Sequence, residues 1–253
     1  MKILLSPAKS MNLDRPIPTY EYSEIAFGQE ATKINKLLQK KSVRSLSKLM
    51  DISDDLASLN FERNHQFSFP FSKENARPAA FFFDGDVYQG LDVESLDNKH
   101  YQALQDRVRI LSGLYGILRP MDLIQAYRLE MGTKFPVGNK KNLVAFWKPK
   151  LSSHLNDELE LDEWVVNLAS IEYFAAIDTQ FLKGQLLHPQ FKDYKNGTLK
   201  TISFFAKKAR GMMARYLVKN KCESREEILL FDEGGYQYSE ANTSDPLKPV
   251  FVR

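Results

Sequence analysis

The residues best suited to chemistry are cations grouped with glycines in the segment 109–134, which reads RILSGLYGILRPMDLIQAYRLEMGTK. Gly113 and Gly116 follow the apolar run 108–111, a pattern typical of a strand that ends in a sharp turn. Three cations follow this turn: Arg119, Arg128 and Lys134. Backbone N–H groups and guanidinium groups presented together are what a phosphate requires. The segment therefore predicts a phosphate-binding loop, with a glycine-proline turn that carries solvated cations as the alternative.

A second group of cations lies in the helix expected over residues 206–220. The cations on and beside one face of this helix are Lys207, Lys208, Arg210 and Arg215. No acidic residue occurs from Thr198 to Cys222, whereas a solvated face usually mixes both signs of charge. Gly211 on the same face costs about 1 kcal/mol of helix stability relative to alanine. We therefore expect close packing or a phosphodiester backbone against this face, with a surface of snorkelling side chains as the alternative.

These two groups and Lys9 predict a nucleic-acid interface if they line one cleft. Several phosphates would then be neutralised together, and binding would weaken steeply with salt. Contacts of this kind hold DNA without reading its sequence, and no helix rich in Asn, Gln and Arg suggests readout in the major groove. We therefore predict backbone-directed binding to duplex or branched DNA that is structure-selective or non-specific.

Acidic and tyrosine side chains after the expected strands form a second candidate site. Asp84 and Asp86 follow the apolar run 79–83, which its length and aromatic content predict to be a buried strand. The other members of this candidate pocket are Tyr88, Glu130, Glu172 and Tyr173. Acid and base residues of α/β proteins often lie beyond strand ends. The alternative function is therefore an enzyme that acts on a nucleobase or nucleotide, although acids at strand ends are also ordinary turn residues.

No metal site and no cofactor are predicted. The four histidines are far apart, and His154 with Glu158 is their only local pair. Cys222 is the single cysteine, which excludes an internal disulfide. We interpret it as a structural thiol, with a peroxide-sensing thiol as the alternative. The sequence contains neither GxxxxGKS nor GxGxxG, so ATP and dinucleotide cofactors are not expected.

The composition is that of a folded protein with nearly balanced charge. The 253 residues are 43% apolar and carry a net charge of +3, so a claim of DNA binding depends on clustering of cations. No run approaches the roughly 20 apolar residues of a membrane span, and the N-terminus lacks a signal-peptide pattern. We predict a cytoplasmic protein with no membrane association and no obligate protein partner.

Short strands that alternate with helices must position these side chains. Strands are expected at residues 3–5, 79–83, 109–111 and 165–168, and helices at 27–50, 53–65, 94–107, 146–159 and 206–220. The segments 186–194 and 198–205 flank Asn196-Gly197, which predicts a tight antiparallel hairpin. No repeat or linker divides the chain. The pattern predicts a mixed α/β (α+β) fold, one compact domain over residues 1–253 with a mixed sheet covered by helices.

Several segments resemble those of a known family. They are SPAKSM (6–11), ENARPA (74–79), GDVYQGLD (85–92), NLASIEY (167–173) and ISFFAKKARGMMARY (202–216), together with 109–134. In this order they resemble the YaaA family of bacterial peroxide-stress proteins over nearly the whole chain. The resemblance implies a cytosolic α/β protein that supports tolerance of hydrogen peroxide and restrains free intracellular iron.

The same resemblance implies DNA binding through a positively charged cleft and an element similar to a helix-hairpin-helix. Gly113 to Gly116 is the expected counterpart of that hairpin, although it has one residue more between its glycines than the usual motif. The resemblance implies no particular catalytic activity.

Overall fold

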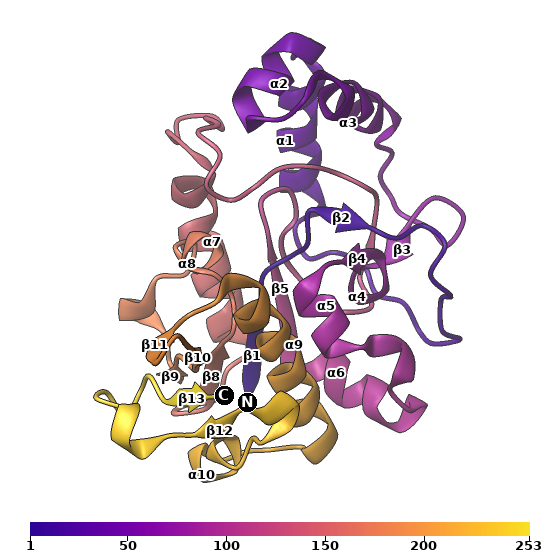
Figure 1. Ribbon diagram of the computed structural model, residues 1–253. Coiled ribbons are helices and arrows are strands. Elements are labelled where there is room, and N and C mark those ends of the chain that lie inside the picture. Colours follow the sequence, from indigo (N-terminus) through magenta and orange to yellow (C-terminus); the bar gives the residue numbers. More distant parts are fainter.

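The computed structural model describes residues 1–253, and a five-stranded sheet of order β6-β5-β1-β8-β9 lies at its centre (Figure 1). The strands are β1 (Lys2–Leu5), β5 (Val108–Ser112), β6 (Gly116–Leu118), β8 (Trp164–Asn167) and β9 (Gln185–Leu187). β1 pairs in parallel with both β5 and β8, and β8 pairs in parallel with β9. Only β6 is antiparallel, to β5.

The strand order creates a switch point between β1 and β8. The chain passes from β1 to its neighbour β5 on one side, and later returns to β8 on the other side of β1. In open α/β sheets, ligands bind beyond the carboxyl ends of the strands at such a point.

A four-stranded sheet of order β11-β10-β13-β12 forms the second sheet. Its strands are β10 (Gln190–Lys195), β11 (Thr198–Lys200), β12 (Gln237–Tyr238) and β13 (Val250–Val252). Two short ladders join β2 (Ser10–Met11) with β4 (Phe83–Asp84), and β3 (Arg77–Pro78) with β7 (Leu123–Ile124). The ladder of β2 and β4 ties the segment after β1 to the segment that carries Asp84.

Helices surround the central sheet. They are α1 (Gly28–Gln39), α2 (Val43–Met50), α3 (Asp54–Gln66), α4 (Ala79–Phe82), α5 (Asp86–Leu91), α6 (Tyr101–Arg107), α7 (Leu143–Asp157), α8 (Ile171–Phe174), α9 (Ser203–Asn220) and α10 (Arg225–Leu229). Helices α1 to α3 form a group at the top of Figure 1, and the two termini lie together at the opposite end. One continuous apolar core extends from Met1 to Phe251. None of the helices has the length and hydropathy needed to cross a membrane.

The mixed α/β fold predicted from the sequence is confirmed, and so are the strands near residues 3–5, 109–111 and 165–168. The Asn-Gly turn joins β10 to β11 in antiparallel pairing, with φ of 53° at Asn196 and 72° at Gly197. The expected hairpin segments were too long, because β9 belongs to the central sheet and α9 begins at Ser203.

The prediction of a strand at residues 79–83 is wrong. Residues 79–82 form the buried helix α4, flanked by the two-residue strands β3 and β4. The N–H groups of Ala79 and Ala80 donate to the carbonyls of Asp122 and Pro120, which holds the helix in the core. An apolar run of this length is buried in either conformation, so its hydrophobicity does not distinguish them.

Two predicted helices have different bounds. The segment 94–107 contains two 3₁₀ turns, Val93–Ser95 and Asn98–His100, and only then α6. Helix α7 begins at Leu143 rather than near Pro149, because the Asn142 side chain accepts a hydrogen bond from Ala145 N at 2.8 Å and caps the helix.

Candidate functional site

A pocket of about 440 Å³ opens beyond the carboxyl ends of β1 and β8, at the switch point of the sheet. We call it the switch-point pocket. Its lining residues are Ser6, Pro7, Ala8, Lys9, Ser10, Asp84, Gly85, Asp86, Val87, Tyr88, Glu130, Leu168, Ser170, Glu172, Tyr173, Lys207 and Arg210. This volume is within the range of about 300–1,000 Å³ that is typical of small-molecule sites. All six residues predicted for a strand-end pocket belong to it.

Two serines connect the strand ends that form the floor of the pocket. Ser6 follows β1, and its Oγ accepts a hydrogen bond from the backbone N–H of Ser170 at 2.9 Å. The buried Tyr88 hydroxyl donates to the Ser6 carbonyl at 3.1 Å. The loops after β1 and β8 and the helix α5 are therefore fixed relative to one another.

Helices α5 and α9 form one wall, and two glycines allow them to approach closely. A Cβ on Gly90 would overlap the carbonyl oxygen of Lys208, and a Cβ on Gly211 would overlap that of Val87. This contact carries Lys207 and Arg210 of α9 to the pocket that Asp86 of α5 also lines. Gly211 therefore serves the close packing of two helices, the first of the two alternatives that its place in a cationic helix face suggested.

Three cations line the pocket from two different segments. Lys9 and Lys207 are exposed, and Arg210 is half-buried. Lys9 Nζ lies 2.9 Å from Glu130 Oε1, and Lys207 Nζ lies 4.0 Å from Asp86 Oδ2. Arg210 makes no hydrogen bond or ion pair, and burial lowers the pKa of its guanidinium. An unpaired, partly desolvated guanidinium is suited to bind an anion.

Four carboxylates lie among these cations, so the pocket is not uniformly basic. Asp84 pairs with Arg15 at 3.1 Å. Glu130 pairs with Arg128 at 2.9 Å in addition to Lys9. Glu172 accepts a hydrogen bond from Gly132 N at 2.9 Å. No three side chains of the types His, Cys, Asp and Glu are grouped closely enough to hold a metal ion.

The two tyrosines of the pocket remain protonated at neutral pH. Burial raises the pKa of Tyr88 well above 10, and burial also raises the pKa of Tyr173. Their phenol groups can donate hydrogen bonds, but they cannot serve as bases. Any general base in this pocket would have to be one of the carboxylates.

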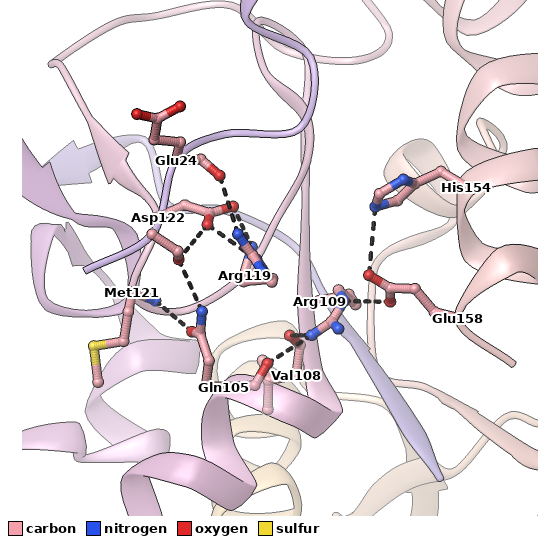
Figure 2. Close-up of polar contacts among 10 residues, drawn as sticks. Glu24, Gln105, Val108, Arg109, Arg119, Met121, Asp122, His154 and Glu158 are labelled. Atoms are coloured by element: carbon pink, nitrogen blue, oxygen red, sulfur yellow. Dashed lines mark hydrogen bonds and ion pairs between the residues drawn. The ribbon is translucent and has the colours of Figure 1, made fainter. Parts of the chain in front are cut away.

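Arg119 does not join the other cations at the switch-point pocket. Its Nε lies 3.1 Å from Asp122 Oδ1, and its guanidinium also donates to the Glu24 carbonyl at 3.1 Å (Figure 2). Asp122 is buried, which raises its pKa. Arg119 therefore closes the turn that contains Asp122 and connects it to the segment that contains Glu24.

A partly buried cluster of Arg109, His154 and Glu158 lies next to Arg119 (Figure 2). Arg109 Nε donates to Glu158 Oε2 at 2.6 Å, and His154 lies 3.4 Å from the other carboxylate oxygen. Burial opposes ionisation of Glu158, but the hydrogen bonds from His154 and Arg109 and the charges of Arg109 and Lys2 lower its pKa to about 2. The predicted local pair of His154 and Glu158 is therefore a structural contact, in which Arg109 forms the ion pair with Glu158.

Other predicted cations also lie outside the pocket lining. Arg215 donates to the carbonyls of Leu91, Asp92 and Ser95, which fixes the end of α5. Lys208 and Lys134 are exposed and are not part of the lining. Arg128 reaches the edge of the pocket only through its ion pair with Glu130. The prediction that all these cations line one cleft is therefore wrong for Arg119 and Arg215.

The turn from Gly113 to Gly116 joins two strands rather than two helices. Ser112 pairs with Gly116 in the antiparallel ladder of β5 and β6. Both glycines are buried, Trp147 Nε1 donates to the Gly113 carbonyl at 2.9 Å, and the Trp147 ring covers Gly116. The predicted helix-hairpin-helix element is therefore wrong at this place, and these amides do not face solvent.

Cys222 is 2% exposed, and burial raises the pKa of its thiol. A thiol that reacts with peroxide needs thiolate character and access. The interpretation as a structural thiol agrees with this environment, and the sensor alternative does not.

Sequence reasoning missed the two serines that anchor the pocket. Ser6 directly follows the strand expected at residues 3–5, and Ser170 follows the strand expected at 165–168. A polar residue after each of two buried strands was the available signal, since parallel strands end at the same edge of a sheet.

Comparisons with known proteins give matches that cover nearly the whole chain. The family model described as "Peroxide stress protein YaaA" matches residues 1–242. A UPF0246 protein of Flavobacterium johnsoniae is 54% identical over 253 residues, and one of Flavobacterium psychrophilum is 48% identical, each over the full length of both chains. A UPF0246 protein of Saccharophagus degradans is 46% identical over 100% of this chain and 99% of its own. This chain therefore belongs to the YaaA family of peroxide stress proteins.

Proposed function

We propose that this peroxide stress protein binds DNA in the cytoplasm at the switch-point pocket, and that one unstacked nucleotide of the bound DNA enters the pocket. The backbone phosphates lie against Lys9, Lys207, Lys208 and Arg210. The observation that carries the proposal is the unpaired, half-buried Arg210 among four carboxylates in a pocket at the switch point of the sheet.

The cations support binding of the phosphates. Helix α9 has no acidic residue, and Lys207 and Lys208 are exposed at its N-terminal half. Lys9 approaches from the loop after β1. Phosphate contacts from such side chains supply most of the affinity in non-specific binding to DNA.

The carboxylates support entry of a base. A bare phosphodiester strand along the pocket floor would be repelled by Asp84, Asp86, Glu130 and Glu172. Carboxylates accept hydrogen bonds from the exocyclic amino groups of bases. A nucleotide satisfies both kinds of lining residue, because its phosphate is anionic and its base carries hydrogen-bond donors.

Binding to duplex, single-stranded and branched DNA at several salt concentrations tests the proposal. The variant Lys9→Ala/Lys207→Ala/Lys208→Ala removes three exposed cations near the pocket. We expect weaker binding. The slope of the logarithm of the binding constant against the logarithm of salt concentration is expected to be less steep by about 0.9 for each lost duplex phosphate contact. Fluorescence anisotropy with labelled oligonucleotides measures both quantities.

The matched control is Lys36→Ala/Lys40→Ala/Lys41→Ala, which removes the same charge from exposed lysines at the end of α1. This control is expected to bind DNA with an unchanged salt slope. Equal losses in both triple variants would mean that the switch-point pocket is not the binding site.

Protection of DNA follows from this proposal. DNA covered by the protein is less accessible to iron-driven oxidation, which accounts for a role in peroxide stress without storage of iron by the protein. Strand breakage of plasmid DNA by ferrous iron and peroxide is expected to decrease with the native protein and not with the triple lysine variant of the pocket.

A second candidate function is an enzyme that acts on a nucleobase or nucleotide. The four carboxylates favour it, because the buried tyrosines cannot act as bases whereas Asp86 or Glu172 could accept a proton. Single-turnover assays with nucleosides and damaged duplexes test this candidate. Product formation that disappears in Asp86→Asn or Glu172→Gln would support it, and no product with any substrate would remove it.

A further inference from the structure

A second pocket, of about 620 Å³, shares no lining residue with the switch-point pocket. It lies between the loop after β2, helix α3, the segment before β3 and the segment after β7. Four of its lining residues, 74–77, belong to the ENARPA segment that the proposed DNA site does not use. We call it the α3 pocket.

The charged side chains of the α3 pocket are mostly cationic. Arg63, Lys73 and Arg77 line it together with a single acid, Glu74. Arg63 makes no hydrogen bond or ion pair although it is half-buried, and burial lowers its pKa. Arg77 donates one hydrogen bond to the Arg15 carbonyl at 3.2 Å and has no carboxylate partner. Two guanidinium groups thus face one cavity without the anions that usually pair with them.

The α3 pocket also has an apolar part, which includes Leu59 on the same helix as Arg63. Leu13, Ile17 and Leu59 line it and are 56%, 37% and 41% exposed. Contact between large aliphatic side chains and water is unfavourable, and an apolar ligand in the cavity would remove it. The pocket therefore combines a surface for an apolar body with a site for a negative group.

Polar side chains hold one wall of the pocket in place. Gln125 Nε2 donates to the Asn75 carbonyl at 3.1 Å and to Ser68 Oγ at 3.2 Å, and Ser68 N donates back to Gln125 Oε1 at 3.0 Å. These bonds connect the segment before β3 with the segment after β7. The wall is therefore formed before a ligand binds, which lowers the entropy lost on binding.

We propose that the α3 pocket binds a small organic anion that has an oxyanion head group, phosphate or carboxylate, on an apolar body. The head group lies between Arg63 and Arg77, where each guanidinium can donate two parallel hydrogen bonds to it. The apolar body lies against Leu13, Ile17 and Leu59. This site is independent of DNA binding at the switch-point pocket.

Isothermal titration of the full chain with four probes tests the proposal: phenyl phosphate, phenylacetate, inorganic phosphate and phenol. Phenyl phosphate or phenylacetate is expected to bind at one site, at least tenfold more tightly than inorganic phosphate or phenol, and the tighter of the two identifies the head group. The variants Arg63→Met and Arg77→Met are each expected to weaken this binding at least tenfold. Arg44→Met, at an exposed arginine of α2, is the control and is expected to bind as the native protein does.

Three further variants separate loss of ligand contacts from loss of folding and from effects at the DNA site. Leu59→Ser is expected to weaken binding of the aromatic anion and to leave inorganic phosphate unchanged, and Arg63→Lys replaces Arg63→Met if the latter fails to fold. The triple variant of Lys9, Lys207 and Lys208 is expected to retain full binding. The absence of saturable binding for both aromatic anions, or binding that Arg63 and Arg77 variants leave unchanged, would overturn the proposal.

Discussion

The backbone N–H of Ser170 donates to the side-chain oxygen of Ser6 across the carboxyl ends of β8 and β1, at 2.9 Å. Ser6→Ala removes this acceptor and leaves a partly buried N–H without a partner. We expect a loss of about 1–2 kcal/mol in the free energy of unfolding. Ser170→Ala removes only a 3.4 Å contact between the two hydroxyls and is expected to cost less. Urea denaturation compares the two variants, and an equal loss in both would show that the backbone bond does not matter.

Helices α5 and α9 depend on Gly211 for their close approach. Gly211→Ala places a methyl group against the Val87 carbonyl, so we expect a loss of about 3 kcal/mol or more, or failure to fold. Lys219→Ala, at an exposed residue of the same helix, is expected to be nearly neutral. Thermal unfolding measures the difference. A Gly211→Ala protein of native stability that no longer binds DNA would instead assign this glycine to a phosphate contact.

Glu158 makes stability depend on pH in the acid range. Its pKa is about 2 in the folded protein against an ordinary value of 4.5, so its ionised form stabilises the fold above pH 4.5. This contribution is lost as the pH falls from 4.5 towards 2. The difference in unfolding free energy between the native protein and Glu158→Gln is therefore expected to shrink in that interval. A difference that stays constant from pH 6 to pH 3 would contradict the depressed pKa.

Cys222 is expected to react slowly with thiol reagents and with peroxide in the native protein. The thiol is buried and its pKa is raised, so both access and thiolate character are low. The reaction with a chromogenic disulfide is expected to be fast only after denaturation. Cells that carry Cys222→Ala are expected to tolerate peroxide as well as cells with the native protein, and a loss of tolerance would restore the sensor hypothesis.

The sequence predicted three strands of the central sheet and the acidic and tyrosine residues of the strand-end pocket, because each has a local pattern. It did not predict the order of the strands or their parallel pairing. Short apolar runs followed by acids such as Asp84 or Glu172 have the pattern of strands or buried segments with polar residues at one edge. The run at residues 79–83 was assigned to a strand because burial alone does not distinguish a short helix from a strand. Its carboxyl-terminal neighbours Asp84 and Asp86 still line the pocket, because β4 continues directly from α4.

The partners of individual cations could not be predicted from the sequence. Arg215 lies on the same helix as Lys207 and Arg210, but its guanidinium donates to backbone carbonyls at the end of α5. Arg119 pairs with the buried Asp122 and also donates to the distant Glu24 carbonyl. Gly211 in a cationic helix face suggested either close packing or a ligand, but the sequence did not show that its packing partner is α5, far earlier in the chain. The contact partners of these residues are set by packing between segments that are distant in the chain, and local sequence patterns do not show which segments meet.

Fluorescence of 2-aminopurine in a DNA probe tests most directly whether a nucleotide of bound DNA enters the switch-point pocket. Loss of stacking increases the emission of this base, so binding of the native protein is predicted to raise the fluorescence of a probe that contains it. Asp86→Asn/Glu172→Gln is predicted to bind the same probe with a smaller rise, whereas the control variant of Lys36, Lys40 and Lys41 gives the full rise. Saturated binding without any rise, or the same rise in the carboxylate variant, would contradict the proposal that the pocket holds an unstacked nucleotide.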